Sequence, residues 1–300
     1  MKNRRRFDRI GKKVSVVIGA VLISACAIQR TTRVPFSILP SQAQEASLEQ
    51  LLLRLRDRSD AFQTLLATAE LLPAAGSIYS GVVREYRDVK AHILLDRRSR
   101  FRMVGQAPII RNNIFDIASD GDNFRLSIPS KRKFIVGKNS VTKNAGNTLE
   151  NLRPQHIFDA LVFKSFDDDN EKFFLQEGRE GNRQYYIVHA VSEDKTSRID
   201  LKRKVWFDRA DLEVFRIQWF GPEGRYMQDV NYGDYQDFKG INYPTMIQLT
   251  RPGEDYRLGI RISKVTFNQS IEAGKFFLDQ PKGFERVELG NVGASGGSSD

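Results

Sequence analysis

The sequence predicts a mainly β protein: a strongly curved antiparallel sheet, an open half-barrel of about 10–12 strands with two helices covering its concave face. From residue 77 to about residue 268, runs of alternating apolar and polar residues are separated by hairpin signals, among them Asp120-Gly121 and Pro252-Gly253. No strand–helix–strand alternation occurs along this region, so the strands pair with their neighbours in sequence. An antiparallel sheet of this length has to curl.

Residues 1–25 are predicted to be an export signal. The first 13 residues carry seven Lys or Arg against one Asp, and the twelve that follow, VSVVIGAVLISA, are mostly apolar. This length is typical of a signal-peptide core and short for a bilayer span. The export route stays open between the ordinary secretory route and the twin-arginine route, because NRRRFDR resembles a twin-arginine signal in all but Asp8.

Cys26 is the only cysteine of the chain, and it directly follows Ile23, Ser24 and Ala25. Small residues before a cysteine at the cleavage edge resemble the lipobox of bacterial lipoproteins. The resemblance implies that Cys26 carries a diacylglycerol and a further acyl chain such as palmitate, and so anchors the protein to a membrane. Ala27 stands where an aspartate would retain the protein at the inner membrane, which implies the periplasmic face of the outer membrane. The alternative is a chance cysteine in a signal peptide cleaved elsewhere.

The charge distribution argues against a nucleic-acid partner. The formal net charge is +10, and the first 13 residues supply +6 of it. In the remainder, Lys and Arg are interleaved with Asp and Glu, whereas a nucleic-acid binder gathers its basic residues into a patch or stripe.

Two segments at the ends of the mature chain are predicted to lack regular structure, and they bound a single domain over residues 47–289. Residues 26–46 show no periodicity and contain Pro35 and Pro40, so they form a flexible tether between the anchor and the domain. Residues 290–300 are rich in Gly and Ser and are expected to be disordered.

The first helix is expected over residues 48–72. Ser47 and Gln50 have the spacing of a capping box, and Pro73 marks the end. Apolar residues recur at steps of three and four: Leu48, Leu51, Leu52, Leu55, Phe62, Leu65, Leu66, Ala69 and Leu72. We expect this amphipathic helix to dock on its own domain, with a helix lying on the membrane surface as the alternative.

The second helix is expected over residues 152–163, where Ile157, Phe158 and Leu161 recur at helical spacing between two strand regions. Phe62, Leu65 and Leu66 of the first helix and these three residues form a set expected to line the inner side of a helical lid.

The sequence contains no constellation that supports catalysis. It has no nucleophile elbow, P-loop, HExxH motif or second cysteine, and His92, His156 and His189 lie far apart without the spacing of metal ligands. The acidic stretch 167–171 lacks the glycine-centred loop of a known calcium site. We therefore expect no catalytic residue, no metal and no cofactor, and a protein that is not an enzyme.

The order of these elements over residues 47–287 resembles the LolA/LolB-like superfamily of periplasmic lipoprotein carriers and outer-membrane lipoprotein receptors. Two turn patterns carry the resemblance. An Asp-Gly turn followed by a proline-centred turn matches Asp120, Gly121 and Pro129, and the closing pattern matches Phe277, Pro281 and Gly283. The resemblance implies the half-barrel fold and a lipid-binding or lipoprotein-binding function.

The resemblance also implies roles for individual residues. In the carriers, an arginine after a strand holds the helical lid closed and an aromatic residue follows; the matching positions are Arg97 and Phe101, while Arg98 replaces the usual proline. The alternative for Arg97 is a surface arginine paired with Asp96 or another acid. Phe101 joins the expected cavity lining. In the receptors, a loop exposes an apolar residue, and the matching loop holds Ile109 and Ile110, with burial against the sheet as the alternative.

The function implied is that of an outer-membrane lipoprotein, held by Cys26, whose apolar cavity binds acyl chains or lipidated cargo for transfer or localisation in the cell envelope. The alternative is a non-enzymatic scaffold or assembly partner with the same fold, a filled cavity and another envelope protein as its partner.

Overall fold

The computed structural model describes residues 43–75, 84–85, 89–139, 153–193 and 197–289. All of them lie in one compact unit, Ser41–Asp300. The export signal, Cys26, most of the tether and the C-terminal tail fall outside the described residues, so the predictions made for them stay predictions.

The described residues form two α-helices and fifteen strands. They are α2 (Leu48–Asp60), β1 (Thr64–Ala75), β2 (Arg84–Glu85), β3 (Val89–Asp96), β4 (Arg100–Gln106), β5 (Asn113–Ser119), β6 (Asn123–Ile128), β7 (Lys133–Lys138), α3 (Pro154–Leu161), β8 (Lys172–Glu180), β9 (Arg183–Glu193), β10 (Ile199–Asp208), β11 (Val214–Phe220), β12 (Tyr226–Phe238), β13 (Ile241–Arg251), β14 (Tyr256–Phe267) and β15 (Glu285–Leu289).

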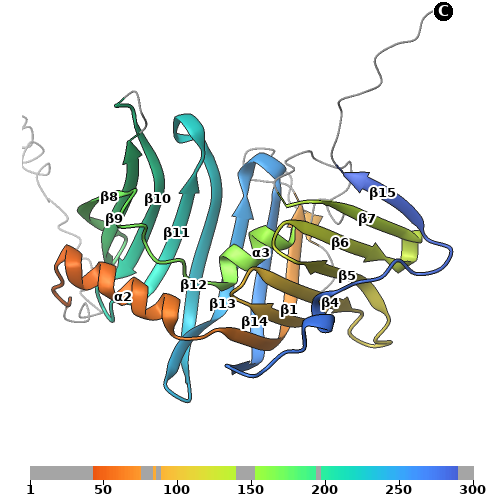
Figure 1. The fold of residues 1–300 in the computed structure, drawn as a ribbon. Helices are drawn as coiled ribbons and strands as arrows, with labels where there is room; N and C mark the ends of the chain where they lie inside the picture. Colours follow the sequence, from red (N-terminus) through yellow and green to blue (C-terminus); the bar gives the residue numbers. More distant parts are fainter. Residues whose placement is uncertain (1–42, 76–83, 86–88, 140–152, 194–196, 290–300) are drawn as a thin grey trace, which may run out of the picture. The chain divides into compact units, whose positions relative to one another are not determined.

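All the strands belong to one open, curved sheet, in the order β15-β7-β6-β5-β4-β3-β1-β14-β13-β12-β11-β10-β9-β8, with β2 paired to β1 (Figure 1). Neighbouring strands are antiparallel, apart from β15, which runs parallel to β7. The long-range pair β1–β14 joins two runs of consecutive hairpins. The predicted fold class is confirmed, with more strands than the sequence indicated.

The first helix is shorter than predicted, and this accounts for one of the additional strands. It ends at Asp60, and Thr64–Ala75 is β1, which pairs with β3 on one side and β14 on the other. Leucines and alanines occur at both odd and even positions of this segment, so its apolar residues also fit a helical spacing. Ladders on both edges satisfy its backbone as a central strand, and this tertiary pairing overrides the local pattern.

The start of α2 is as predicted. Ser47 Oγ accepts a hydrogen bond from Gln50 N at 3.3 Å, and Gln50 Oε1 accepts one from Ser47 N at 2.8 Å. Leu51 and Leu55 are fully buried against the sheet, so the helix docks on its own domain. None of the helices among the described residues combines the length and the apolar character required to cross a bilayer.

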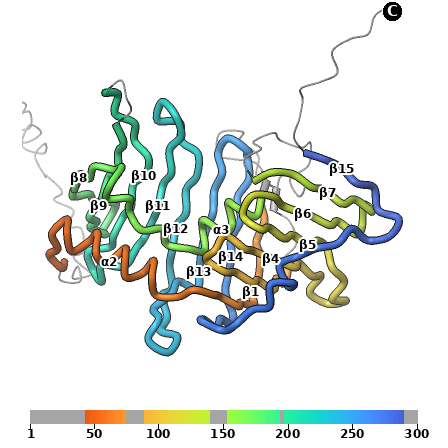
Figure 2. Tube along the Cα trace, in the orientation of Figure 1, coloured from red at the N-terminus to blue at the C-terminus, as the bar shows by residue number. Residues whose placement is uncertain are grey.

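The second helix, α3, carries Pro154 in its first turn and buries Ile157, Phe158 and Leu161. Residues 162–171, here named the strap, lead from α3 to β8 and bury Val162, Phe163 and Phe166. α2, α3 and the strap lie on the same face of the sheet (Figures 1 and 2). They therefore form a cover over the concave face.

The first of the two sequence patterns behind the family resemblance, Asp120-Gly121 followed by Pro129, forms two turns in the structure. Asp120 Oδ1 accepts hydrogen bonds from the backbone N–H of Asp122 and Asn123, at 3.1 and 2.8 Å, and Gly121 has a φ of +108° that favours glycine. Pro129 begins a short 3-10 helix, Pro129–Lys131, between β6 and β7.

Candidate functional site

The concave face and its cover hold one contiguous apolar cluster. Six of the seven residues predicted to line a cavity belong to it, with 0–4% of each exposed: Phe62, Leu65, Phe101, Ile157, Phe158 and Leu161. The seventh, Leu66, alternates with Leu65 along β1, so it lies on the opposite face, is half-buried and is not part of the cluster.

Aromatic rings fill the region where α2 ends and the strap begins. Phe62 contacts Tyr243 and Phe267, with ring centroids 5.8 and 4.9 Å apart, and Phe163 contacts Tyr232 at 5.0 Å. The Tyr232 hydroxyl is buried without a hydrogen-bond partner among the described residues, and burial raises its pKa well above the ordinary value. Protein side chains therefore fill this part of the concave face, and the Tyr232 hydroxyl is buried there without a hydrogen-bond partner among the described residues.

A single carboxylate fastens α2 to the turn before β11. Glu213, whose side chain is only 9% exposed, pairs through Oε1 with Arg54 at 2.9 Å and with Arg58. Arg54 Nε also donates to Leu212 O at 2.7 Å, and Arg58 Nη1 donates to Asn242 O at 3.1 Å. Two arginines of α2 thus converge on one buried acid, whose other oxygen, Oε2, has no hydrogen-bond partner among the described residues.

Arg97, predicted as the lid latch, lies in the turn between β3 and β4 and reaches the last turn of α2. Its Nη2 donates to Ser59 Oγ at 2.8 Å, and Nη1 lies 3.6 Å from Asp60 Oδ1. Ser59 Oγ also accepts a hydrogen bond from the strap, from Ser165 N at 3.3 Å. The buried Ser59 therefore links α2, the strap and the β3–β4 turn at one point.

The neighbouring acid, Asp96, is held by other arginines. It pairs with Arg98 at 3.3 Å and with Arg100. Burial alone would raise the pKa of Asp96, but hydrogen bonds from the Arg98 backbone and the Arg100 side chain hold it below the ordinary value. Asp96 thus fixes the β3–β4 turn and leaves the Arg97 side chain directed to α2.

The strap is held by Arg203 of β10, a buried residue that the sequence analysis did not single out. Its guanidinium donates to Lys164 O at 2.8 Å and Ser165 O at 2.6 Å, pairs with Glu171 at 3.2 Å and lies 4.3 Å from the centre of the Phe166 ring. Burial lowers the pKa of Arg203, although Glu171 opposes this effect. Arg203 shares its face of β10 with Val205 and Phe207, so an arginine in register with buried residues was a signal available in the sequence.

The turn between β4 and β5 exposes both aliphatic residues of the predicted loop. Ile109 is 92% exposed and Ile110 is 70% exposed, so neither is buried against the sheet. The turn is closed by backbone hydrogen bonds from Ala107 N to Asn112 O at 2.9 Å and from Arg111 N to Ala107 O at 3.1 Å. A hydrogen-bonded turn therefore presents the two side chains to solvent.

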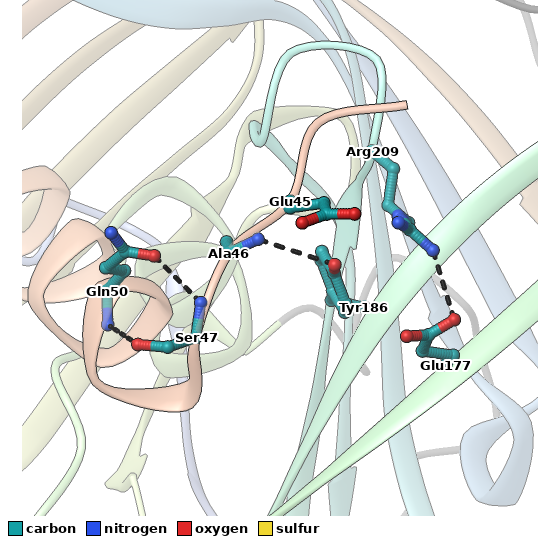
Figure 3. A pocket seen from close by; sticks show the side chains of 7 residues that line it. All are labelled: Glu45, Ala46, Ser47, Gln50, Glu177, Tyr186 and Arg209. Carbon is teal, nitrogen blue, oxygen red and sulfur yellow. Dashed lines mark hydrogen bonds and ion pairs between the residues drawn. The ribbon is translucent and has the colours of Figure 1, made fainter. Parts of the chain in front are cut away.

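A separate hollow of about 510 Å³ lies beside the start of α2 (Figure 3). It is lined by Glu45, Ala46, Ser47, Gln50, Glu177, Tyr186 and Arg209. Arg209 pairs with Glu177 at 3.1 Å and lies over the Tyr186 ring at 4.5 Å, and its backbone oxygen accepts a hydrogen bond from Gln44 N at 2.7 Å. These walls are polar and mutually paired, so the hollow differs from the apolar cavity predicted. It marks where the chain leaving the tether is fastened to the domain.

No protein-family model matches this sequence, and no curated protein matches it. Solved structures do resemble the fold. A DUF1329 family protein from Desulfovibrio piger matches with a TM-score of 0.50 and 17% identity, over 76% of this chain and 94% of that one. A LolA superfamily protein from Nitrosomonas europaea gives 0.49 and 11%, over 78% and 99%. A domain named for outer membrane lipoprotein sorting, from Vibrio parahaemolyticus, gives 0.47 and 12%, over 75% and 94%.

At these identities the likeness concerns the fold alone. The sheet order and the two helices over the concave face agree with the architecture expected from the sequence. The fold of the chain is similar to that of the DUF1329 family protein.

Proposed function

We propose that the protein is an outer-membrane lipoprotein, anchored through Cys26, that binds acyl chains of a lipid or a lipidated protein on its concave face after α2 and the strap move aside. The observation that carries the proposal is the cover itself. A largely apolar face lies under two segments, α2 and the strap, whose polar contacts are few and centre on Glu213, Ser59 and Arg203. Such a cover has a closed and an open state, and a ligand that binds only the open state shifts the balance between them.

The energies involved are of comparable size. Lifting α2 exposes Leu51 and Leu55, at about 1.5–3 kcal/mol for each side chain, and breaks the contacts of Arg54, Arg58 and Arg97. Burial of an acyl chain is worth up to about 0.8 kcal/mol per methylene, or roughly 10 kcal/mol for a dozen. A chain of that length offsets the lifting of α2, and the unpartnered Tyr232 hydroxyl would meet a carbonyl oxygen of its ester. Binding and release need no bond to be broken.

Ile109 and Ile110 supply a second apolar contact in this proposal. Two exposed branched side chains on a hydrogen-bonded turn suit insertion among acyl chains, either of the cargo or of the membrane surface. Together with acyl chains on Cys26, this turn would keep the domain at the lipid surface while cargo passes.

The test is to purify the full-length protein from envelopes and to analyse the lipids that organic solvent extracts from it by mass spectrometry. The acyl chains on Cys26 are covalent and stay with the protein, so they do not confound the measurement. A stoichiometric acyl species, together with saturable binding of a fluorescent fatty acid, is the expected result. Matched preparations of Arg97→Leu should exchange that fatty acid faster than the unaltered protein.

The second candidate is the scaffold with a filled concave face. It is favoured by one observation: the six lining residues are 0–4% exposed in the closed arrangement. No extractable acyl species and no saturable binding would support this candidate and overturn the carrier proposal.

A further inference from the structure

The strand β8 forms one of the two edges of the sheet. Among the described residues it pairs with β9 alone, along its whole length from Lys172 to Glu180. In Figure 1 it lies at the end of the sheet beside β9. An unpaired edge presents backbone N–H and C=O groups that can pair with another strand, and native proteins normally keep such edges short. With nine residues, β8 is longer than the usual strand of about 5–6.

We propose that a second copy of this chain pairs with β8, antiparallel and about a two-fold axis that passes between the two Gln176 residues. In this register Lys172 lies opposite Glu180 of the second copy, Phe173 opposite Arg179, Phe174 opposite Gly178, and Leu175 opposite Glu177. Each pairing occurs twice because of the symmetry. All nine residues of both strands then have a partner.

The register follows from the sequence of the strand. Residues directly opposite each other share a face of the sheet, so the axis has to pass through a residue and not between two. An axis at Glu177 would place two carboxylates face to face, which is destabilising. An axis at Leu175 would leave Arg179 and Glu180 without partners. Only the axis at Gln176 pairs the basic start of each strand with the acidic end of the other.

The apolar surface of β8 fits the same register. Phe174 is 55% exposed and lies on the face of Gln176 and Gly178. A Cβ atom at Gly178 would lie 2.8 Å from Ile187 Cδ1, so the Ile187 side chain reaches over this glycine from β9. An aromatic ring directly across from a glycine can lie over the glycine without meeting a side chain of that residue. In the dimer, the Phe174 ring of each copy lies opposite Gly178 of the other and beside the Ile187 side chain that reaches over it.

Disulfide trapping tests the proposal in the full-length protein in its membranes. Residues opposite each other in antiparallel strands have Cα atoms about 4.5 or 5.5 Å apart, within the range that a disulfide bridges. Gln176→Cys is therefore expected to give a covalent homodimer under mild oxidation, seen on a non-reducing gel. Glu180→Cys alone should give none, because its counterpart lies about 27 Å away, eight residues at about 3.4 Å each. Co-expressed Lys172→Cys and Glu180→Cys should cross-link with each other. The unaltered chain, with Cys26 alone, controls for a free thiol at the anchor.

A charge exchange supplies a second, independent measurement. In the Gln176→Cys background, Glu180→Lys places two lysines opposite each other and should lower the cross-linked fraction about tenfold, since like charges oppose pairing. Adding Lys172→Glu restores opposite charges and should restore the dimer.

Three outcomes would overturn the proposal. The first is a Gln176→Cys variant whose introduced thiol reacts freely with a maleimide but gives no dimer. The second is equal cross-linking of Gln176→Cys and Glu180→Cys, which would indicate random collision. The third is an introduced thiol in Gln176→Cys that is protected from maleimide without a homodimer, because this would assign the edge to a different protein.

Discussion

Glu213→Gln is expected to loosen α2 without unfolding the sheet. The substitution keeps the shape of the side chain and removes the charge that pairs with Arg54 and Arg58. Breaking a fully buried pair costs about 3–5 kcal/mol. Here the two arginines keep backbone carbonyl partners and are partly exposed, so we expect about 1.5–3 kcal/mol, the range of a hydrogen bond to a charged group. A loss of about 2 kcal/mol corresponds to a roughly 30-fold larger open population.

Hydrogen–deuterium exchange followed by mass spectrometry checks this prediction, by comparing peptides that span residues 48–60 with peptides from β12 and β13. The matched control is Asp168→Asn, which breaks the ion pair between Asp168 and Arg56 of the same helix. Both side chains of that pair are about half exposed, so its loss should change exchange in α2 by less than about 1 kcal/mol. Equal effects of the two variants, or acceleration spread evenly over the sheet, would refute the role assigned to Glu213.

Four further predictions concern the anchor, the latch, the core and the pH dependence. Cys26→Ser removes the residue that carries the acyl chains and should leave an unprocessed or periplasmic protein, because even one acyl chain binds a membrane only marginally, at about 10⁴ M⁻¹. Salt-resistant sedimentation with outer membranes would contradict this. Arg97→Leu should accelerate exchange of a bound fatty acid with little change in Tm, and a sharp drop in Tm with unchanged exchange would make Arg97 purely structural. Leu65→Ala should cost about 2–5 kcal/mol in denaturant unfolding, the full value for a packed core, whereas a much smaller loss would indicate an open cavity beneath the cover. Burial, aided by the charge of Arg251, lowers the pKa of His156 to about 3. The unfolded chain therefore binds one more proton between about pH 6.5 and 3, and stability should fall there by up to about 1.4 kcal/mol per pH unit as the pH is lowered. In His156→Gln this pH-dependent loss of stability should vanish. Equal losses of stability in both proteins between about pH 7 and 5 would show that His156 does not cause it.

The local features of the fold were predictable because their causes lie within a few residues. Ser47 and Gln50 satisfy each other's backbone N–H across three positions, so the predicted start of α2 is confirmed. The Asp120 side chain folds its own turn in the same way. Alternating apolar residues indicated a curved antiparallel sheet with its inner side buried.

The candidate site was predicted in part. Arg97 was selected through a family resemblance, and the structure places its guanidinium against the last turn of α2. Glu213 and Arg203 were missed, since Glu213 lies 155 residues from Arg58 and Arg203 lies 38 residues from Ser165. The place of a residue in a surface turn or on a strand does not indicate which distant residues it contacts once the chain is folded.

The sequence by itself determined the curved sheet, the two helices of its cover and, through its first 26 residues, the predicted route to a membrane. It did not determine where the first helix stops, because residues 64–75 suit either a helix or a strand until β3 and β14 lie beside them. Tertiary structure decided that point, together with the filling of the concave face by the strap and the exposure of β8 at an edge. The physical reason is the same in each case. Capping and turn formation are local, whereas ladder partners, buried ion pairs and free edges depend on residues brought together from distant parts of the chain.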